Sequence, residues 1–182
     1  MIAVVLAALI YLGIFSAAAR VPDRCSLAPG LSCGALKIGA EAQTGNVYLQ
    51  SVKLTNALPQ RILVCGLECR TGSEPVSRPS SCGSAFGQGG STSYIPPGDS
   101  ATVSGSGAIV TPLSNPDGSP YTGPVSYIGR LYCKEGQGEN VMESEAGQAL
   151  RANLFTYYVR EGDVTGNMRV LGGDFATTVQ PG

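Results

Sequence analysis

The six cysteines are the residues best placed for chemistry in this chain of 182 residues. An even number of cysteines behind a long apolar stretch predicts disulfides formed in an oxidising compartment. A zinc site is the weaker alternative, because the closest pair is spaced CxxxC, no second close pair follows, and the chain has no histidine. The cysteines are Cys25, Cys33, Cys65, Cys69, Cys82 and Cys133.

The pairing of the first two cysteines follows from the residues between them. Pro29 and Gly30 form a turn signal, which favours a bond between Cys25 and Cys33. For the others we expect Cys69 to bond Cys82, which leaves Cys65 for Cys133.

Catalysis is not expected from the remaining polar residues. Without histidine, the chain cannot form a Ser-His-Asp or Cys-His arrangement. Glu135, Glu139, Glu143 and Glu145 could supply the paired carboxylates of a glycosidase. Their glycine-rich surroundings are typical of a solvated loop, however, and the chain has no tryptophan to stack on a sugar. We therefore predict that the protein is not an enzyme.

Cofactors, metals and nucleic acids are also not expected. The glycine-rich residues 86–91 and 104–110 lack the Lys-Ser/Thr that a phosphate-binding loop needs. Asp117 and Gly118 read as a turn, and the longer calcium-loop signature is missing. A net charge of -1 with 14% charged residues supplies no basic surface for a phosphate backbone.

The first element that must position these residues is an uncharged stretch of 18 residues, 2–19. As a helix it would rise about 27 Å, close to the hydrocarbon thickness of a bilayer. Its apolar residues lie all round, which predicts a helix surrounded by lipid or by other apolar helices. Small residues such as Gly13 and Ser16 would let helices approach closely.

Three interpretations of this stretch compete: a cleaved secretory signal, a permanent membrane anchor, and a helix that later packs against its own copies. A signal should carry a basic n-region, and Met1 and Ile2 supply none.

The second kind of element is the β-strand. Residues 46–56 and 61–65 are rich in apolar and β-branched side chains, and the turn 57–60 between them predicts a hairpin. Period-2 alternation predicts strands at 99–107, with Ala101 and Val103 on one face, and at 124–134.

The C-terminal part adds further strands. Residues 143–162 fit a helix or a strand, but their aromatic and β-branched content favours a strand from Ala149. Residues 167–179 predict a hairpin with Gly172 and Gly173 as its two-residue turn. The Ser-, Gly- and Pro-rich residues 70–100 predict a long surface excursion.

These elements predict a mainly β fold, in which an N-terminal hydrophobic α-helix precedes an antiparallel β-sandwich of immunoglobulin-like type. The predicted boundaries are a hydrophobic helix at residues 1–21, a disulfide-stapled collar at 22–33 and a β-sandwich head at 34–182.

The order of these parts resembles archaeal type IV pilins. The stretch AVVLAALIYLGIFSAAARVPDRCSLAPGLSC is similar to their helix-to-head junction, in which Tyr-Leu-Gly precedes a proline-bearing Arg-Cys collar. VKLTNALPQRILVCGLEC looks like their first head hairpin. The family's basic leader and the early acidic residue of bacterial pilins do not occur here. We therefore expect that the chain begins inside a longer precursor or assembles differently.

The resemblance implies a structural subunit of an extracellular, cell-surface filament that serves adhesion or motility. Such a subunit waits in the membrane with its head outside until assembly machinery adds it to a helical homopolymer. An apolar helix then exchanges lipid for identical helices, so little hydrophobic free energy is lost. The residues expected in the polymer core are Ile2, Val4, Val5, Leu6, Leu9, Ile10, Tyr11, Leu12, Gly13, Ile14 and Phe15.

A second interpretation belongs to a different class. The chain would be a membrane-anchored extracellular binding module with a disulfide-stabilised β-sandwich. The loops around residues 71–98 would then hold a ligand, and any other anchor could replace the apolar stretch.

Overall fold

The computed structural model describes residues 23–76, 94–104, 109–111, 130–161, 163 and 167–182. No helix in this part of the chain is long and apolar enough to cross a membrane. Residues 1–21, predicted to be a hydrophobic helix, lie outside it. The described strands are β1 (Arg24–Leu27), β2 (Leu31–Ala40), β3 (Val47–Asn56), β4 (Ile62–Arg70), β5 (Tyr94–Ile95), β6 (Ser100–Ser104), β7 (Ile109–Thr111), β8 (Leu131–Lys134), β9 (Ala149–Arg160), β10 (Arg169–Thr178) and β11 (Gln180–Pro181).

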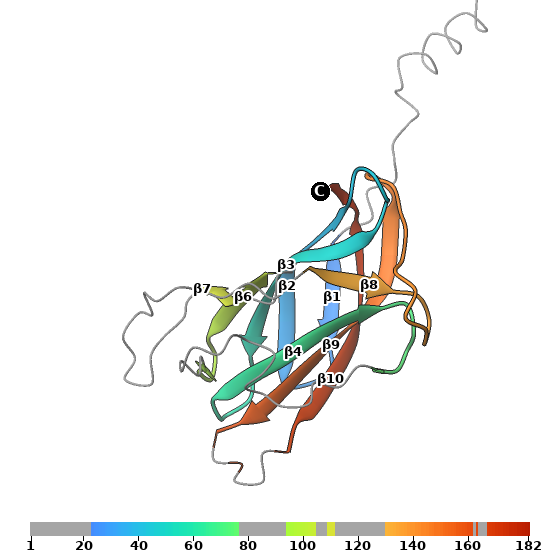
Figure 1. Cartoon of the computed structure of the whole chain (residues 1–182). Coiled ribbons are helices and arrows are strands. Elements are labelled where there is room, and N and C mark those ends of the chain that lie inside the picture. Colours follow the sequence, from blue (N-terminus) through green and yellow to red (C-terminus); the bar gives the residue numbers. More distant parts are fainter. Residues whose placement is uncertain (1–22, 77–93, 105–108, 112–129, 162, 164–166) are drawn as a thin grey trace, which may run out of the picture.

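The strands form two sheets that β8 joins (Figure 1). The first sheet runs β1-β10-β9-β4, with β5 beside β4. The second runs β11-β2-β3, with β6 and then β7 beyond β3. Strand β8 pairs with β4 through Cys133 and Lys134 and with β3 through Leu131 and Tyr132. The two layers are therefore hydrogen-bonded to each other along one side.

The predicted fold class is wrong in two respects. The described residues contain no helix, and the sheet is mixed, because β8 runs parallel to β4 and β11 runs parallel to β2. Strand β11 is parallel because only Val179 separates it from β10, so the chain changes sheets without reversing its direction. Strand β8 reaches β4 after a connection of dozens of residues, long enough for the crossover that parallel pairing requires.

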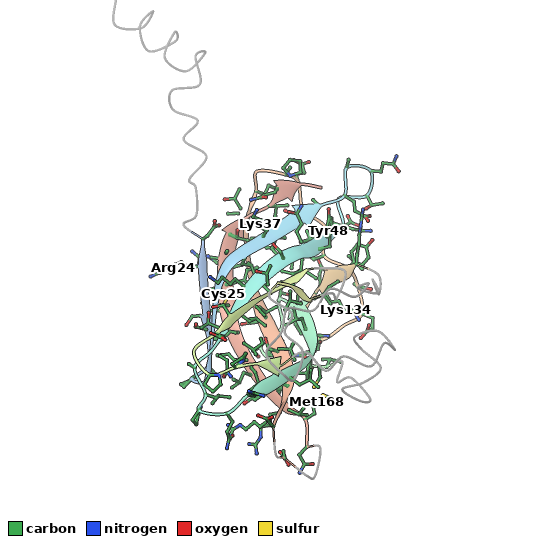
Figure 2. All side chains as sticks on the ribbon, turned by 90° about the vertical axis from the view of Figure 1, so that its left-hand side faces the viewer. Arg24, Cys25, Lys37, Tyr48, Lys134 and Met168 are labelled. Atoms are coloured by element: carbon green, nitrogen blue, oxygen red, sulfur yellow. A yellow bond between two sulfur atoms is a disulfide. The ribbon has the colours of Figure 1, made fainter. Side chains whose placement is uncertain are left out.

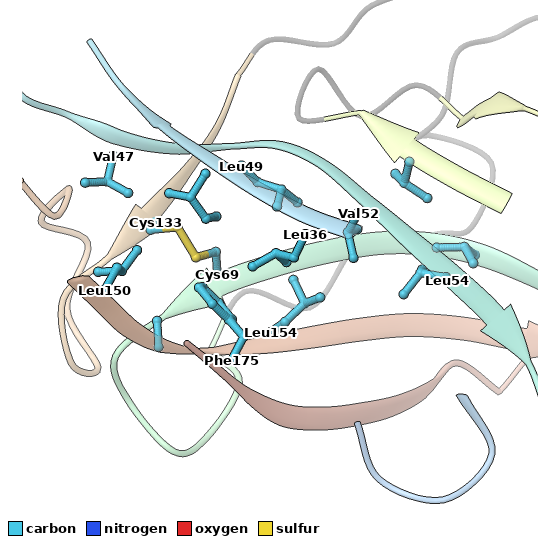
Figure 3. Close-up of a cluster of buried hydrophobic side chains, with 14 of the residues drawn as sticks. Leu36, Val47, Leu49, Val52, Leu54, Cys69, Cys133, Leu150, Leu154 and Phe175 are labelled. Atoms are coloured by element: carbon cyan, nitrogen blue, oxygen red, sulfur yellow. A yellow bond between two sulfur atoms is a disulfide. The ribbon is translucent and has the colours of Figure 1, made fainter. Parts of the chain in front are cut away.

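The main core lies between the two sheets, as Figure 3 shows. Leu49 and Val52 of the second sheet face Leu154 and Phe175 of the first, and all four side chains are buried. The predicted inward face of the 99–107 strand is confirmed in its described part, because Ala101 and Val103 are buried. The first sheet also buries apolar side chains on its other face, where Cys65, Phe155 and Tyr157 form a second cluster.

The predicted hairpin of residues 46–65 is half right. Both strands exist as β3 and β4, but they belong to different sheets and do not pair. The buried Asn56 explains the crossing. Its side-chain amide donates to the carbonyls of Gln60 and Ile95, each at 2.8 Å, and its Oδ1 accepts from the Leu58 N–H at 2.9 Å. These bonds hold the connection in a course that carries the chain from one sheet to the other.

The C-terminal strand predictions have opposite outcomes. The strand from Ala149 is confirmed as β9. The Gly172–Gly173 turn is wrong, because both glycines lie inside the ten-residue strand β10. The two glycines instead allow neighbouring strands and side chains to approach β10 closely. A Cβ on Gly172 would stand 2.7 Å from the Phe155 ring. A Cβ on Gly173 would stand 1.8 Å from the backbone oxygen of Ser26 in β1.

The replacement Gly173→Ala should therefore detach β1 from β10. The clash is with the backbone, which cannot rotate away, so we expect a loss of at least about 2 kcal/mol in the free energy of unfolding. Chemical denaturation of the full chain measures it. Gly34→Ala is the matched control, because a Cβ there meets nothing within 4 Å. Equal stability of the two variants would contradict the close approach.

Candidate functional site

The first described strand, β1, is the edge strand of the first sheet. Arg24 of β1 pairs with Ala176 of β10, and the Thr177 hydroxyl donates to Asp23 Oδ1 at 2.6 Å. Strand β1 has only four residues. A force applied through the preceding residues would therefore act on a short strand.

Two disulfides reinforce this region and the seam between the sheets. Cys25 of β1 is bonded to Cys33 of β2, as predicted, which ties the first sheet to the second. Cys69 is bonded to Cys133, so the predicted Cys69–Cys82 and Cys65–Cys133 bonds are wrong. The reason is register, because Cys69 and Cys133 stand opposite each other in the β4–β8 pair. Cys65 is also disulfide-bonded, and Cys82 lies outside the described residues.

We call the end of the sheets beside the start of β1 the proximal end. It consists of the β2–β3 connection (residues 41–46), the β8–β9 connection (135–148) and residues 180–182. Backbone hydrogen bonds lock these segments together. The Ser144 N–H donates to the Gly45 carbonyl at 2.9 Å, and the Gly147 N–H donates to the Val179 carbonyl at 2.8 Å. The proximal end is therefore one hydrogen-bonded surface, which we call the platform, rather than a set of independent loops.

A cluster of polar and aromatic side chains lies on this platform. Glu41 Oε1 accepts from Arg130 Nη1 at 2.5 Å and from the Tyr132 hydroxyl at 2.6 Å, and its Oε2 accepts from the Thr44 hydroxyl at 2.7 Å. The Arg130 guanidinium also lies 4.8 Å from the centroid of the Tyr48 ring. Arginine and tyrosine are the residues that dominate binding energy in protein interfaces.

The hydrogen bonds change the acidity of Glu41. The bond from Tyr132 is the largest cause, followed by the bond from Thr44, and with Arg130 they lower the pKa of Glu41 from 4.5 to about 2. The same contact raises the pKa of the Tyr132 hydroxyl. Glu41 therefore remains a carboxylate well below pH 4.5.

This lowered pKa predicts a pH-dependent stability. A carboxyl group whose pKa is lower in the folded state stabilises the fold above its unfolded pKa, near 4.5 here, and loses that effect as pH falls through about 2. The variant Glu41→Gln should therefore unfold at a lower temperature than the unaltered chain above pH 4.5, and the difference should close toward pH 2. Thermal unfolding across this range tests it. A gap that does not change with pH would assign the effect to shape alone.

A groove of about 680 Å³ lies on the same platform. Its walls are the β2–β3 connection, the β8–β9 connection and residues 181–182, and Glu143 and Glu145 are among its lining residues. The stretch around these glutamates is exposed and mostly without strands, as the sequence predicted. No three His, Cys, Asp or Glu side chains in the described part of the chain are arranged to hold a metal ion.

A buried ion pair underlies the platform. Arg70 is 0% exposed and Glu68 is 4% exposed. Arg70 Nε donates to Glu68 Oε1 at 2.5 Å, and the Tyr157 hydroxyl donates to Glu68 Oε2 at 2.6 Å. Arg70 Nη1 donates to the Gly136 carbonyl at 2.9 Å, and the Val76 N–H donates to Glu68. The pair therefore ties the connections that leave β4 and β8 to the first sheet.

No protein-family model matches the chain, and no curated protein or solved structure is significantly similar to it.

The structure describes only part of the site expected from the sequence. All eleven residues expected in the polymer core lie outside the described residues, as does most of the 71–98 loop. Five of the six cysteines are described. Sequence reasoning missed the Glu41 and Glu68 clusters. Glu68 and Arg70 did leave a signal, since two charges at i and i+2 in an otherwise apolar strand share one face.

Proposed function

We propose that this chain is the structural subunit of an extracellular type IV pilus-like filament that serves adhesion or motility. The observation that carries the proposal is the uncharged stretch of residues 2–19, which leads directly into a disulfide-bonded β head. Before assembly the stretch lies in the membrane, and assembly machinery then brings copies together so that these stretches form the polymer core. The β head faces the outside of the fibre.

Three features of the head support this proposal. The bonds Cys25–Cys33 and Cys69–Cys133 suit an oxidising, extracellular setting. The first of them also links the short β1 to the second sheet, so a pull along the apolar stretch is shared by both sheets. The proximal end is hydrogen-bonded into a platform, which suits a surface pressed against neighbouring subunits.

The proposal is tested by negative-stain electron microscopy of material sheared from cells without detergent. Long uniform fibres that contain this chain, identified by mass spectrometry of the washed fibres, are the expected result. Small particles that require detergent for release would contradict it.

The groove at the proximal end favours a second candidate, a membrane-anchored extracellular binding module. Its volume of about 680 Å³ lies in the range of small-molecule sites. Replacing residues 2–19 by an unrelated membrane anchor separates the two candidates. A binding module would keep its function after this exchange, whereas a filament subunit would lose assembly.

A further inference from the structure

Two arginines converge on the outer face of the first sheet, next to the proximal end. Arg24 of β1 and Arg151 of β9 both stand opposite Ala176 of β10, one on each side. Neighbouring strands lie about 4.8 Å apart, so the two Cα atoms are separated by about 10 Å. Both arginines and the small Ala176 line a pocket of about 450 Å³.

This arginine pair (Arg24 and Arg151) is exposed. Figure 2 shows Arg24 pointing away from the ribbon. Neither arginine takes part in an ion pair among the residues that the structure describes. Asp174, two residues before Ala176 in β10, lines the same pocket but forms no ion pair with either arginine. The two arginines therefore leave the pocket with an excess of positive charge.

A matching pair of carboxylates stands on the platform. Glu143 and Glu145 are exposed, and within the described part of the chain neither takes part in an ion pair. The residue between them, Ser144, is held by Gly45 at 2.9 Å, and the preceding Met142 is buried. The two glutamates are therefore an acidic pair on a rigid connection. Positions i and i+2 of an extended chain lie about 7 Å apart, within reach of two arginines about 10 Å apart.

We propose that the arginine pair of one copy binds Glu143 and Glu145 of a neighbouring copy through ion pairs. The two surfaces are different and share no residue, so the contact is heterologous and extends into an open chain of copies instead of closing a dimer. The glutamates belong to the proximal end and the arginine pair lies next to it, where heads would meet around the apolar core. This inference rests on the proposed function and adds to it the head-to-head contact.

The test uses charge reversal in the full chain, purified in detergent, with sedimentation velocity at low and high salt as the measurement. One variant carries Arg24→Glu and Arg151→Glu, and a second carries Glu143→Arg and Glu145→Arg. A third carries all four changes, which leaves the net charge at -1, since the two reversals cancel. Lys37→Glu with Lys53→Glu is the matched control, because it changes the net charge as the first variant does, from exposed positions on the second sheet.

We expect each single-patch variant to raise the dissociation constant for self-association about tenfold, as two exposed ion pairs allow. The four-change variant should return close to the unaltered value, and the lysine control should stay there. Association of the unaltered chain should weaken at high salt, because exposed charges are screened.

Unchanged association of both single-patch variants would overturn the proposal. Failure of the four-change variant to recover, with the lysine control normal, would overturn the pairing. Fibre formation by cells that make the unaltered chain is measured separately. If these cells form no fibres but the purified chain still associates in a salt-sensitive way, the proposed filament function is overturned and the contact between copies is supported.

Discussion

Filaments should be absent from cells that produce the Leu9→Arg variant, while the disulfide-bonded head remains folded. Leu9 lies in the middle of the uncharged stretch of residues 2–19. An arginine at the centre of a membrane segment costs roughly 3 kcal/mol. In a polymer core the same charge would be repeated in every copy and have no partner. Electron microscopy of sheared material measures the loss, and intact Cys25–Cys33 and Cys69–Cys133 disulfides report the folded head.

Two further variants separate polymerisation from membrane insertion. Leu9→Ile keeps the segment apolar and should assemble normally. Gly13→Leu makes the segment more apolar, so insertion should be at least as good, but the larger side chain should prevent close approach of neighbouring copies. Normal fibres from either Leu9→Arg or Gly13→Leu would show that residues 2–19 do not form the polymer core. Loss of membrane association in Gly13→Leu would show that insertion, not packing, had failed.

The second large effect is expected at the buried ion pair. The variant Arg70→Met removes the arginine from the buried Glu68–Arg70 pair, and removing one partner of a buried pair costs about 3–5 kcal/mol. The Gly136 carbonyl also loses its donor from Arg70. Denaturant unfolding of the full chain should therefore show one of the largest losses for any single replacement in the head.

A double replacement shows whether the loss comes from the ion pair between Glu68 and Arg70. Glu68→Gln keeps an oxygen in the place of Oε2, which accepts from both Tyr157 and Val76, but removes the charge. Combined with Arg70→Met, it should cost clearly less than the sum of the two single changes. Lys53→Met, at an exposed position of β3, is the control and should change stability by less than about 0.5 kcal/mol. Additive losses would contradict the ion-pair explanation.

Sequence reasoning worked best where a strand keeps its alternation, and bulges are one place where it failed. In β2 the inward residues are Leu31 and Cys33, then Leu36, Ile38 and Ala40. The change from odd to even positions happens at a register shift between Gly34 and Lys37, where Ala35 has a φ of 44°. The 22–33 collar therefore ends inside a strand that the sequence does not mark.

Strand β4 shows the same effect. Ile62 and Val64 face the main core, and after a bulge between Val64 and Gly66 the inward position passes to Leu67 and Cys69. The shift turns Cys69 toward β8 and Cys133. Pairing the cysteines by proximity in the sequence therefore gave the wrong partner for Cys69 and the right one for Cys25.

The sequence by itself determined the uncharged stretch of residues 2–19, the locally closed Cys25–Cys33 bond and the strand character of β3, β6 and β9. These features depend on side chains within a few residues of each other, whose propensities act locally. Tertiary structure alone decided which strands pair, that Cys69 meets Cys133, and that Arg24 and Arg151 converge across β10. The physical reason is that strand pairing and bulges are set by packing between segments far apart in the chain, which local propensity does not contain.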